Sequence, residues 1–173
     1  MSTLILDTEF ADAEATEWVS VGLVPLDAGL PSFYVERKVL PDATEFVRTV
    51  VYPLLDRGDA AMPDAMAADA LRRYLNQLPP PVTIAFDASV DWPVFLGVLN
   101  HPMARESVPE IQSMAIALII GSRYFEALQR IWVSDERRHR RHHALVDAGV
   151  QRDAYLAALG GLHAVTATRL RTK

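Results

Sequence analysis

The chain has 173 residues, half of them hydrophobic and 23% charged, which fits one globular domain and excludes a disordered or fibrous protein. It contains no cysteine, so disulfide bonds, thiolate metal ligands and a thiol nucleophile are excluded, and any metal must bind to oxygen or imidazole. The net charge of −5 excludes a uniformly basic surface for nucleic acid, although positive charge is concentrated in residues 136–143.

The apolar segments of the chain indicate neither a signal peptide nor a transmembrane helix. Asp7 interrupts the first apolar run too early for a signal peptide. No later segment approaches the roughly 18 apolar residues that cross a bilayer. We therefore expect a cytoplasmic protein without a membrane partner.

The chain begins with the pattern of an antiparallel meander. Residues 3–9 read as a strand, residues 17–25 have the β-branched, alternating pattern of a second strand, and residues 32–38 make a third. Residues 27–29, Asp-Ala-Gly, supply the turn between the second and third strands. A sheet is therefore expected to start at the N-terminus.

From Asp42 the apolar residues recur at helical spacing, behind Thr44 as a candidate N-cap, and predict a helix as far as Leu54. A second helix is predicted after Pro63 and is ended by the prolines at 79–81. The buried side of this second helix is expected to consist of Met66, Ala70, Leu71, Tyr74, Leu75 and Leu78.

The second half of the chain alternates strand and helix. Residues 82–86 are expected to form a strand and residues 91–99 a helix. Residues 114–128 are expected to form a helix after a short extended piece near Ile111, with a short strand reaching Ala117 as the alternative. A final helix is predicted from His143 to Leu159, with Leu156 on its buried face and Gly160-Gly161 as its end.

These elements predict an α/β protein in which a mixed sheet, made of the three-strand antiparallel meander and further strands, is flanked by helices. No repeat or linker divides the chain. We expect one domain over residues 1–163 and a C-terminal tail over residues 164–173 that is a candidate for mobility.

Two carboxylates end the first predicted strand. Asp7 and Glu9 are two residues apart, so their side chains point to the same face. Like charges held so close are unfavourable unless a cation neutralises them, and oxygen ligands suit magnesium or manganese. The alternative is a solvated strand end without function.

Asp91 is the first residue of the helix that follows the strand at 82–86. Its carboxylate is expected near the sheet edge, where it can join Asp7 and Glu9. Acidic residues are common at helix N-termini, so helix capping by Asp87 or Ser89 is the alternative explanation of this segment.

The segment that opens the last helix carries two further candidates. Asp147 is flanked by Leu145 and Val146, and a carboxylate in an apolar stretch requires a partner. His142 stands at the helix start, where an imidazole can titrate near neutrality and accept a proton from water. For His139 and His143, a surface position in a basic loop is expected.

Taken in order, these segments resemble the three exonuclease motifs of the DEDDh exonuclease superfamily: Asp-Thr-Glu-Phe at 7–10, an aspartate at the start of a helix, and His-x-Ala-Leu-x-Asp-Ala at 142–148. Residues 16–24, 46–48 and 52–54 extend the likeness to the small bacterial 3′–5′ exoribonuclease family that includes the mycobacterial adenosine-preferring ribonuclease.

This resemblance implies a ribonuclease H-like fold, a homodimer, and a 3′–5′ exoribonuclease that acts on single-stranded RNA with a preference for adenosine. It implies that Asp7, Glu9 and Asp147 hold two Mg²⁺ or Mn²⁺ ions, that Asp91 supports the second ion, and that His142 is the general base. Two such ions, roughly 3.5–4 Å apart, clamp the phosphodiester in enzymes of this kind.

Substrate contacts are expected from basic and aromatic residues near these motifs. The candidates are Phe10, Trp92, Arg137, Arg138, Arg140 and Arg141. The arginines precede His142 and can neutralise phosphates, with a solvated basic loop as the alternative. The aromatic rings can stack on a terminal base, whereas Phe86 and Trp18 are expected in the core. The chain departs from the superfamily at Asp87, where asparagine is frequent, and this departure bears on substrate choice.

Three other functions use the same residues. A 3′–5′ exonuclease directed at DNA or short oligonucleotides needs the same catalytic atoms, because discrimination depends on contacts to the 2′-hydroxyl and the base. A non-catalytic nucleic-acid-binding module can share the fold. An ordinary structural domain can carry the acids as helix caps and solvated ends.

Overall fold

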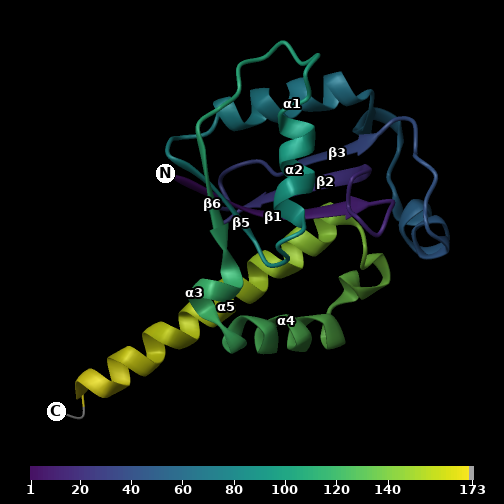
Figure 1. Ribbon diagram of the computed structural model, residues 1–173. Coiled ribbons are helices and arrows are strands. Elements are labelled where there is room, and N and C mark those ends of the chain that lie inside the picture. Colours follow the sequence, from purple (N-terminus) through teal and green to yellow (C-terminus); the bar gives the residue numbers. More distant parts are fainter. Residues whose placement is uncertain (172–173) are drawn as a thin grey trace.

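A six-stranded mixed sheet, with strand order β4-β3-β2-β1-β5-β6, forms the centre of the protein (Figure 1). The computed structural model describes the backbone of residues 1–171 and the side chains of residues 1–160 other than 117 and 119. The strands are β1 (Ser2–Phe10), β2 (Trp18–Pro25), β3 (Phe33–Arg37), β4 (Ala61–Met62), β5 (Val82–Phe86) and β6 (Ile111–Ala115). The first three strands pair antiparallel, as predicted, and β5 and β6 continue the sheet parallel to β1.

Helices cover both faces of this sheet, which confirms the predicted α/β architecture (Figure 1). The α-helices are α1 (Asp64–Asn76), α2 (Asp91–Leu99), α3 (Ile116–Ile120), α4 (Ser122–Ser134) and α5 (Ala144–Arg171). The first two of these helices lie on one face, and α4 and α5 lie on the other (Figure 1). Among the described residues, no helix is both long and apolar enough to cross a membrane.

Strand β1 is buried on both faces, as expected for a central strand. Leu4 and Leu6 enter the core beneath α1 and α2, whereas Ile5 enters the core beneath α4 and α5. Because side chains alternate along a strand, Asp7 and Glu9 share the α5 face with Ile5. The buried centre of the sheet thus directs both carboxylates toward α5.

The helix predicted from Asp42 is present but is not a regular α-helix. Val47–Val51 form a π-helical turn and Tyr52–Leu54 a 3₁₀ turn, which we label η1 and η2. Thr44 occupies the predicted capping position, where its hydroxyl oxygen accepts a hydrogen bond from the Val47 amide at 3.3 Å. Phe46 departs from the expected apolar face, because its side chain is 51% exposed.

Two helix predictions need correction. Met66 is 59% exposed, because the buried arc of α1 is centred on Ala67, Leu71 and the residues one turn further on. The last helix does not end at Gly160-Gly161, since α5 continues to Arg171, and Leu156 on it is exposed. A glycine costs a helix only about 1 kcal/mol relative to alanine, and no proline follows these two. Residues 172 and 173 of the expected tail lie outside the described residues.

Between residues 111 and 134 both expected elements occur in succession. Strand β6 is followed directly by α3, and Gly121, with a φ of +63°, separates α3 from α4. Ile116 and Ile120 are buried, whereas Leu118 is 88% exposed. The apolar run therefore contributes to the core through Ile116 and Ile120, while Leu118 lies on the surface.

Gly22 on β2 determines how closely α5 approaches the sheet. It pairs with Asp7 of β1 in the antiparallel register. A Cβ atom at this position would lie 2.5 Å from the carbonyl of Ala144 and from the amide nitrogen of Leu145. Only a residue without a side chain lets the first turn of α5, which carries Asp147, lie against the strands that carry Asp7 and Glu9.

Replacing Gly22 with alanine is expected to displace α5 and to destabilise the protein by about 1–3 kcal/mol, the usual cost of overpacking. Equilibrium unfolding in urea measures the change. The matched control is Gly97→Ala in α2, where nothing lies within 4 Å of the added Cβ and alanine favours the helix. Equal stability of the two variants would contradict the close contact between β2 and α5.

Candidate active site

Acidic side chains from three elements meet at the C-terminal end of β1. Asp7 and Glu9 come from β1, Asp91 is the first residue of α2, and Asp147 lies in the first turn of α5. Glu9, Asp147 and His142 each place one potential ligand atom within 4.8 Å of the others. The structure thus brings Glu9 and Asp147 together with His142, and Asp7 lies near enough to Glu9, Asp91 and Asp147 for their charges to raise its pKa.

Asp91 is oriented by the residue between the two acids of β1. Its Oδ1 accepts hydrogen bonds from the Thr8 amide at 3.1 Å and from the Thr8 hydroxyl at 2.7 Å. The side chain is 3% exposed, yet its second oxygen, Oδ2, has no hydrogen-bond partner among the described residues. No side chain in the described part of the chain caps α2, so capping by Asp87 or Ser89 does not explain this segment.

Asp147 and Asp7 are each fixed by a hydrogen bond to one oxygen of the carboxylate. The His142 amide donates to Asp147 Oδ2 at 3.0 Å, and Asp147 Oδ1 is buried without a partner among the described residues. Gln151, one turn further along α5, donates from Nε2 to Asp7 Oδ1 at 2.7 Å. Two carboxylates, Asp91 and Asp147, therefore each keep one buried oxygen unused.

Burial and mutual repulsion raise the pKa of every carboxyl in this group. Burial is the larger cause throughout, and for Asp7 it is reinforced by the charges of Asp91 and Glu9. The pKa of Glu9 rises to about 8, that of Asp91 to about 7 and that of Asp147 to about 6. Together these carboxyls cannot all ionise near neutrality without a compensating positive charge.

The donor set fits a hard divalent cation. Carboxylate oxygens are the ligands that magnesium and manganese prefer, and the unpartnered oxygens of Asp91 and Asp147 are buried polar atoms that require a partner. Glu9 and Asp147 already lie close enough to share one ion. The residues present therefore suit a metal centre better than a solvated cluster of acids.

His142 is held in an uncommon backbone conformation beside these acids. Its φ is +75°, a region that non-glycine residues seldom adopt. The imidazole meets the ring of Phe46 edge-on, with centroids 5.1 Å apart. Burial lowers the pKa of His142, and the neighbouring Arg141 lowers it further. The ring is therefore disposed to be neutral, which is the form that can accept a proton.

A hollow of about 280 Å³ adjoins the acids and the histidine. Its lining includes Glu9, His142, Phe10, Thr44 and Phe46. It opens between the end of β1 and the turn that begins η1. A mononucleotide-sized group placed there would lie next to Glu9 and to the imidazole.

Several residues of the site were not selected from the sequence. Thr8 and Gln151 orient acids, and Phe46 borders the hollow. Asp87 lies one residue beyond β5 in line with Asp7, and the Tyr124 hydroxyl donates to its carboxylate at 2.9 Å. Only Gln151 carried a usable sequence signal, since it lies four residues after Asp147 on the same helical face.

Two of the four candidate arginines already have carboxylate partners. Arg137 pairs with Asp135 at 2.6 Å and with Asp153 at 2.7 Å, and Arg140 pairs with Asp56 at 2.6 Å. Their charges are therefore largely neutralised within the protein. The other two have no carboxylate partner in the described part of the chain.

Those other two arginines differ in their distance from the acids. Arg138 donates to the Val133 carbonyl, and Arg141 lies over the Trp132 ring, 5.7 Å from its centroid. Arg141 directly precedes His142, whose amide donates to Asp147, and the charge of Arg141 lowers the pKa of Asp147. Of the four candidates, Arg141 is the best situated to meet a phosphate bound there.

Two sequence expectations about rings are changed by the structure. Trp92 stacks between Phe86, at 5.8 Å, and Phe95, at 5.6 Å, within the core on the α2 face, so its position favours packing. His143 was expected on the surface, and this is wrong, because its side chain is fully buried and stacks on Tyr34 at 4.5 Å. His143 directly precedes α5 and packs against β3 through this ring.

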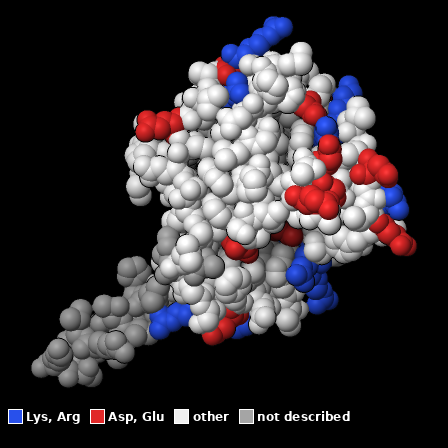
Figure 2. All heavy atoms as spheres, viewed as in Figure 1, with Lys and Arg blue, Asp and Glu red and all other residues white. Residues whose placement is uncertain are grey.

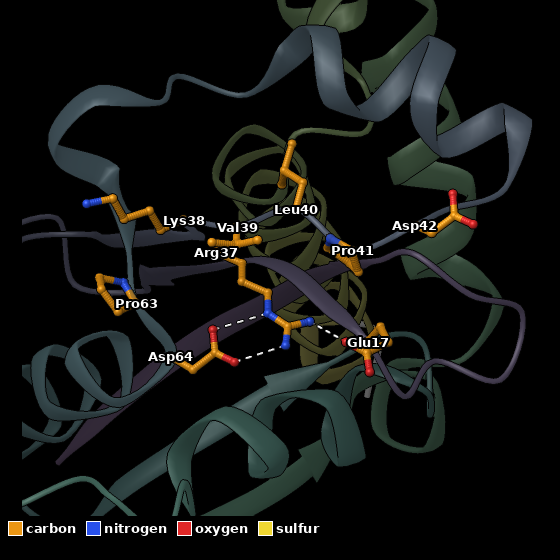
Figure 3. A pocket seen from close by; sticks show the side chains of 9 residues that line it. All are labelled: Glu17, Arg37, Lys38, Val39, Leu40, Pro41, Asp42, Pro63 and Asp64. Atoms are coloured by element: carbon orange, nitrogen blue, oxygen red, sulfur yellow. Dashed lines mark hydrogen bonds and ion pairs between the residues drawn. The ribbon is translucent and has the colours of Figure 1, made fainter.

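A larger hollow, of about 670 Å³, lies around Arg37 (Figure 3). There the guanidinium points between Glu17 and Asp64, and it bonds to both (Figure 3). Because its charge is balanced, this hollow offers little attraction to a phosphate. Figure 2 likewise shows acidic side chains gathered over the right-hand part of the visible face, with a basic group below them.

The fold is ribonuclease H-like, and comparison with solved structures supports this class. The structure of S. pombe Pop2p in its Mg²⁺- and Mn²⁺-bound form matches with a TM-score of 0.59 at 12% sequence identity, and the match covers 88% of this chain and 81% of Pop2p. No protein-family model and no curated protein sequence matches the chain. At this level of identity the likeness concerns the fold alone.

The stability of the metal-free protein is expected to fall as pH rises from about 5 to about 8. The folded pKa values of Glu9, Asp91 and Asp147, about 8, 7 and 6, lie above their unfolded values of about 4, so stability is greatest below the unfolded values and is lost progressively as pH rises from there to the folded values. Magnesium or manganese should remove this loss. Thermal unfolding with EDTA and with each metal measures both effects.

Asp147→Asn serves as the control, because it removes one of the repelling charges and one ligand. It should be more stable than the wild type at about pH 8 without metal and gain less from added metal. A metal-free wild type that is most stable at pH 8 would contradict the crowding of these acids.

Proposed function

We propose that this protein is a divalent-metal-dependent 3′–5′ exonuclease that removes nucleotides from the 3′ ends of single-stranded RNA. The observation that carries the proposal is the group of buried acids with two unpartnered oxygens beside a histidine whose pKa is lowered. The ordered sequence motifs at these same residues add support. A purely structural role for the acids leaves their repulsion unexplained.

Asp7, Glu9, Asp91 and Asp147 would hold two Mg²⁺ or Mn²⁺ ions. When bound, such ions neutralise charge on the scissile phosphate and lower the pKa of water. The protein's part is to keep the acids oriented before substrate arrives. Thr8 and Gln151 do this by hydrogen bonds to Asp91 and Asp7.

His142 would take the proton from the attacking water. Its lowered pKa keeps the imidazole neutral near pH 7, which a general base requires. The terminal nucleotide would occupy the hollow of about 280 Å³ that Glu9 and His142 border. Phe46, half exposed at the rim, would offer a ring for the base to stack on.

Choice of substrate follows from the sequence resemblance. We propose RNA with a preference for adenosine because residues 16–24, 46–48 and 52–54 are similar to the adenosine-preferring exoribonuclease family. Asp87 adds a carboxylate near Asp7, fixed by Tyr124. We also propose the homodimer that the same resemblance implies. Its interface would include the exposed apolar side chains of Leu118 on α3 and Phe125 on α4.

Purified protein is expected to shorten a 5′-labelled single-stranded RNA from its 3′ end, releasing mononucleotides only when magnesium or manganese is present. RNA and DNA oligomers of identical sequence, with adenosine or another nucleotide at the 3′ end, measure the preference. A 3′-phosphorylated oligomer controls for direction. Internal cleavage, or no cleavage under any metal, would contradict the proposal.

His142→Ala should lower kcat by about a hundred- to ten-thousand-fold, the usual contribution of a general base, while metal still raises the unfolding temperature. Asp147→Asn should lose turnover and most of the metal response together. His142 also lies within ligand distance of Glu9 and Asp147. If metal no longer raises the unfolding temperature of His142→Ala, the histidine is a metal ligand and not the general base.

Arg141→Glu is expected to weaken RNA binding and to reduce its dependence on salt, because one phosphate contact is lost. Binding of labelled RNA in calcium, at several salt concentrations, measures the effect. Arg130→Glu on the exposed side of α4 is the control and should bind as the wild type does. If both variants bind RNA with equal affinity, Arg141 does not contact the substrate.

A further inference from the structure

A buried carboxylate on β3 anchors a loop that belongs to no predicted motif. Glu36 is fully buried, and its carboxylate accepts hydrogen bonds from the Asp56 amide at 2.6 Å, from the Arg57 amide at 3.0 Å and from the Tyr34 hydroxyl at 2.8 Å. The Arg57 guanidinium adds an ion pair at 3.3 Å. The backbone of residues 56 and 57 is therefore bound to β3 through Glu36.

Arg57 strengthens this attachment. Its φ is +57°, an unfavourable region for a residue with a side chain, and such conformations persist only where surrounding contacts enforce them. The guanidinium donates to the carbonyls of Arg37 at 3.0 Å and Lys38 at 2.8 Å. The backbone of the loop, and with it the direction of the Asp56 side chain, is thereby determined.

Asp56 contacts both sides of the segment that carries His142. Its Oδ1 pairs with Arg140 at 2.6 Å, and its Oδ2 lies 3.4 Å from His143 Nε2. Arg140 also donates to the Leu54 carbonyl at 3.3 Å, and His143 is stacked on Tyr34. Arg140, two residues before His142, is thus tied to Asp56 by an ion pair, whereas His143, one residue after His142, lies beside the same carboxylate without a hydrogen bond to it among the described residues.

His142 needs such ties because its own conformation is strained. Its φ of +75° costs free energy that neighbouring contacts must offset. Its amide donates to Asp147, which fixes the backbone on the α5 side. Asp56 provides the corresponding hold on the loop side, so the imidazole stays beside Glu9 and Asp147.

We propose that Asp56 is a positioning residue that holds the His142 segment in its working position through Arg140. This inference rests on the proposed function. It gives Arg140 a structural partner in place of the phosphate contact expected from sequence. Because the Asp56–Arg140 pair is partly exposed, it adds little to global stability, and its effect should be local.

The test compares Asp56→Asn with Asp59→Asn, a neighbouring exposed aspartate outside this network. Asp56→Asn should lower kcat by about 10- to 100-fold, because a displacement of about 1 Å can cost a hundredfold, with KM for RNA unchanged. Asp56→Glu should recover part of the loss. The urea midpoint and the metal-induced rise in unfolding temperature should match the wild type, and Asp59→Asn should match it in every respect.

Trypsin provides a readout that does not depend on activity. Residues 137–141 contain four arginines, and release of this segment should accelerate cleavage there several-fold in Asp56→Asn and in Arg140→Gln, with no further increase in the double variant. Cleavage at the wild-type rate would overturn the proposal, as would a raised KM with unchanged kcat. If the wild type hydrolyses no RNA, the proposed function fails, while the trypsin rates still decide whether Asp56 holds the segment.

Discussion

Repulsion among buried carboxylates is the interaction on which the rest of this structure depends. Asp7, Glu9, Asp91 and Asp147 are drawn together at the end of a central strand, where burial makes each charge more costly than it would be in water. A cation is the partner that resolves this conflict. The arrangement of these acids therefore favours the binding of a ligand and lowers the stability of the ligand-free protein.

Small contacts keep the acids in place despite this repulsion. Gly22 lets α5 lie against β2, which brings Asp147 over the end of β1. Thr8 and Gln151 each satisfy one oxygen of a neighbouring acid. The geometry is thus maintained by the backbone and by neutral hydrogen-bond donors, which do not compete with a metal ion for the remaining oxygens.

Positive charge near the site is divided between two tasks. Arg137 and Arg140 are paired with aspartates and shape the segment before His142, whereas Arg141 remains close to Asp147 without a carboxylate partner in the described residues. A net charge of −5 is compatible with a polyanionic substrate only if local charge near the reacting phosphate is favourable. The metal ions and Arg141 would supply it.

The sequence by itself predicted the meander and the mixed sheet, because strand alternation and helical periodicity are local properties of the chain. The same local patterns placed Asp7 and Glu9 on one face of a strand and Asp91 at the start of a helix. It could not predict the burial of His143 or the partner of Arg140. Those depend on which distant segment covers each side chain, and Asp56 meets Arg140 only because the loop after η2 returns to the sheet. Tertiary structure decided them, since pairing across more than eighty residues leaves no period in the chain.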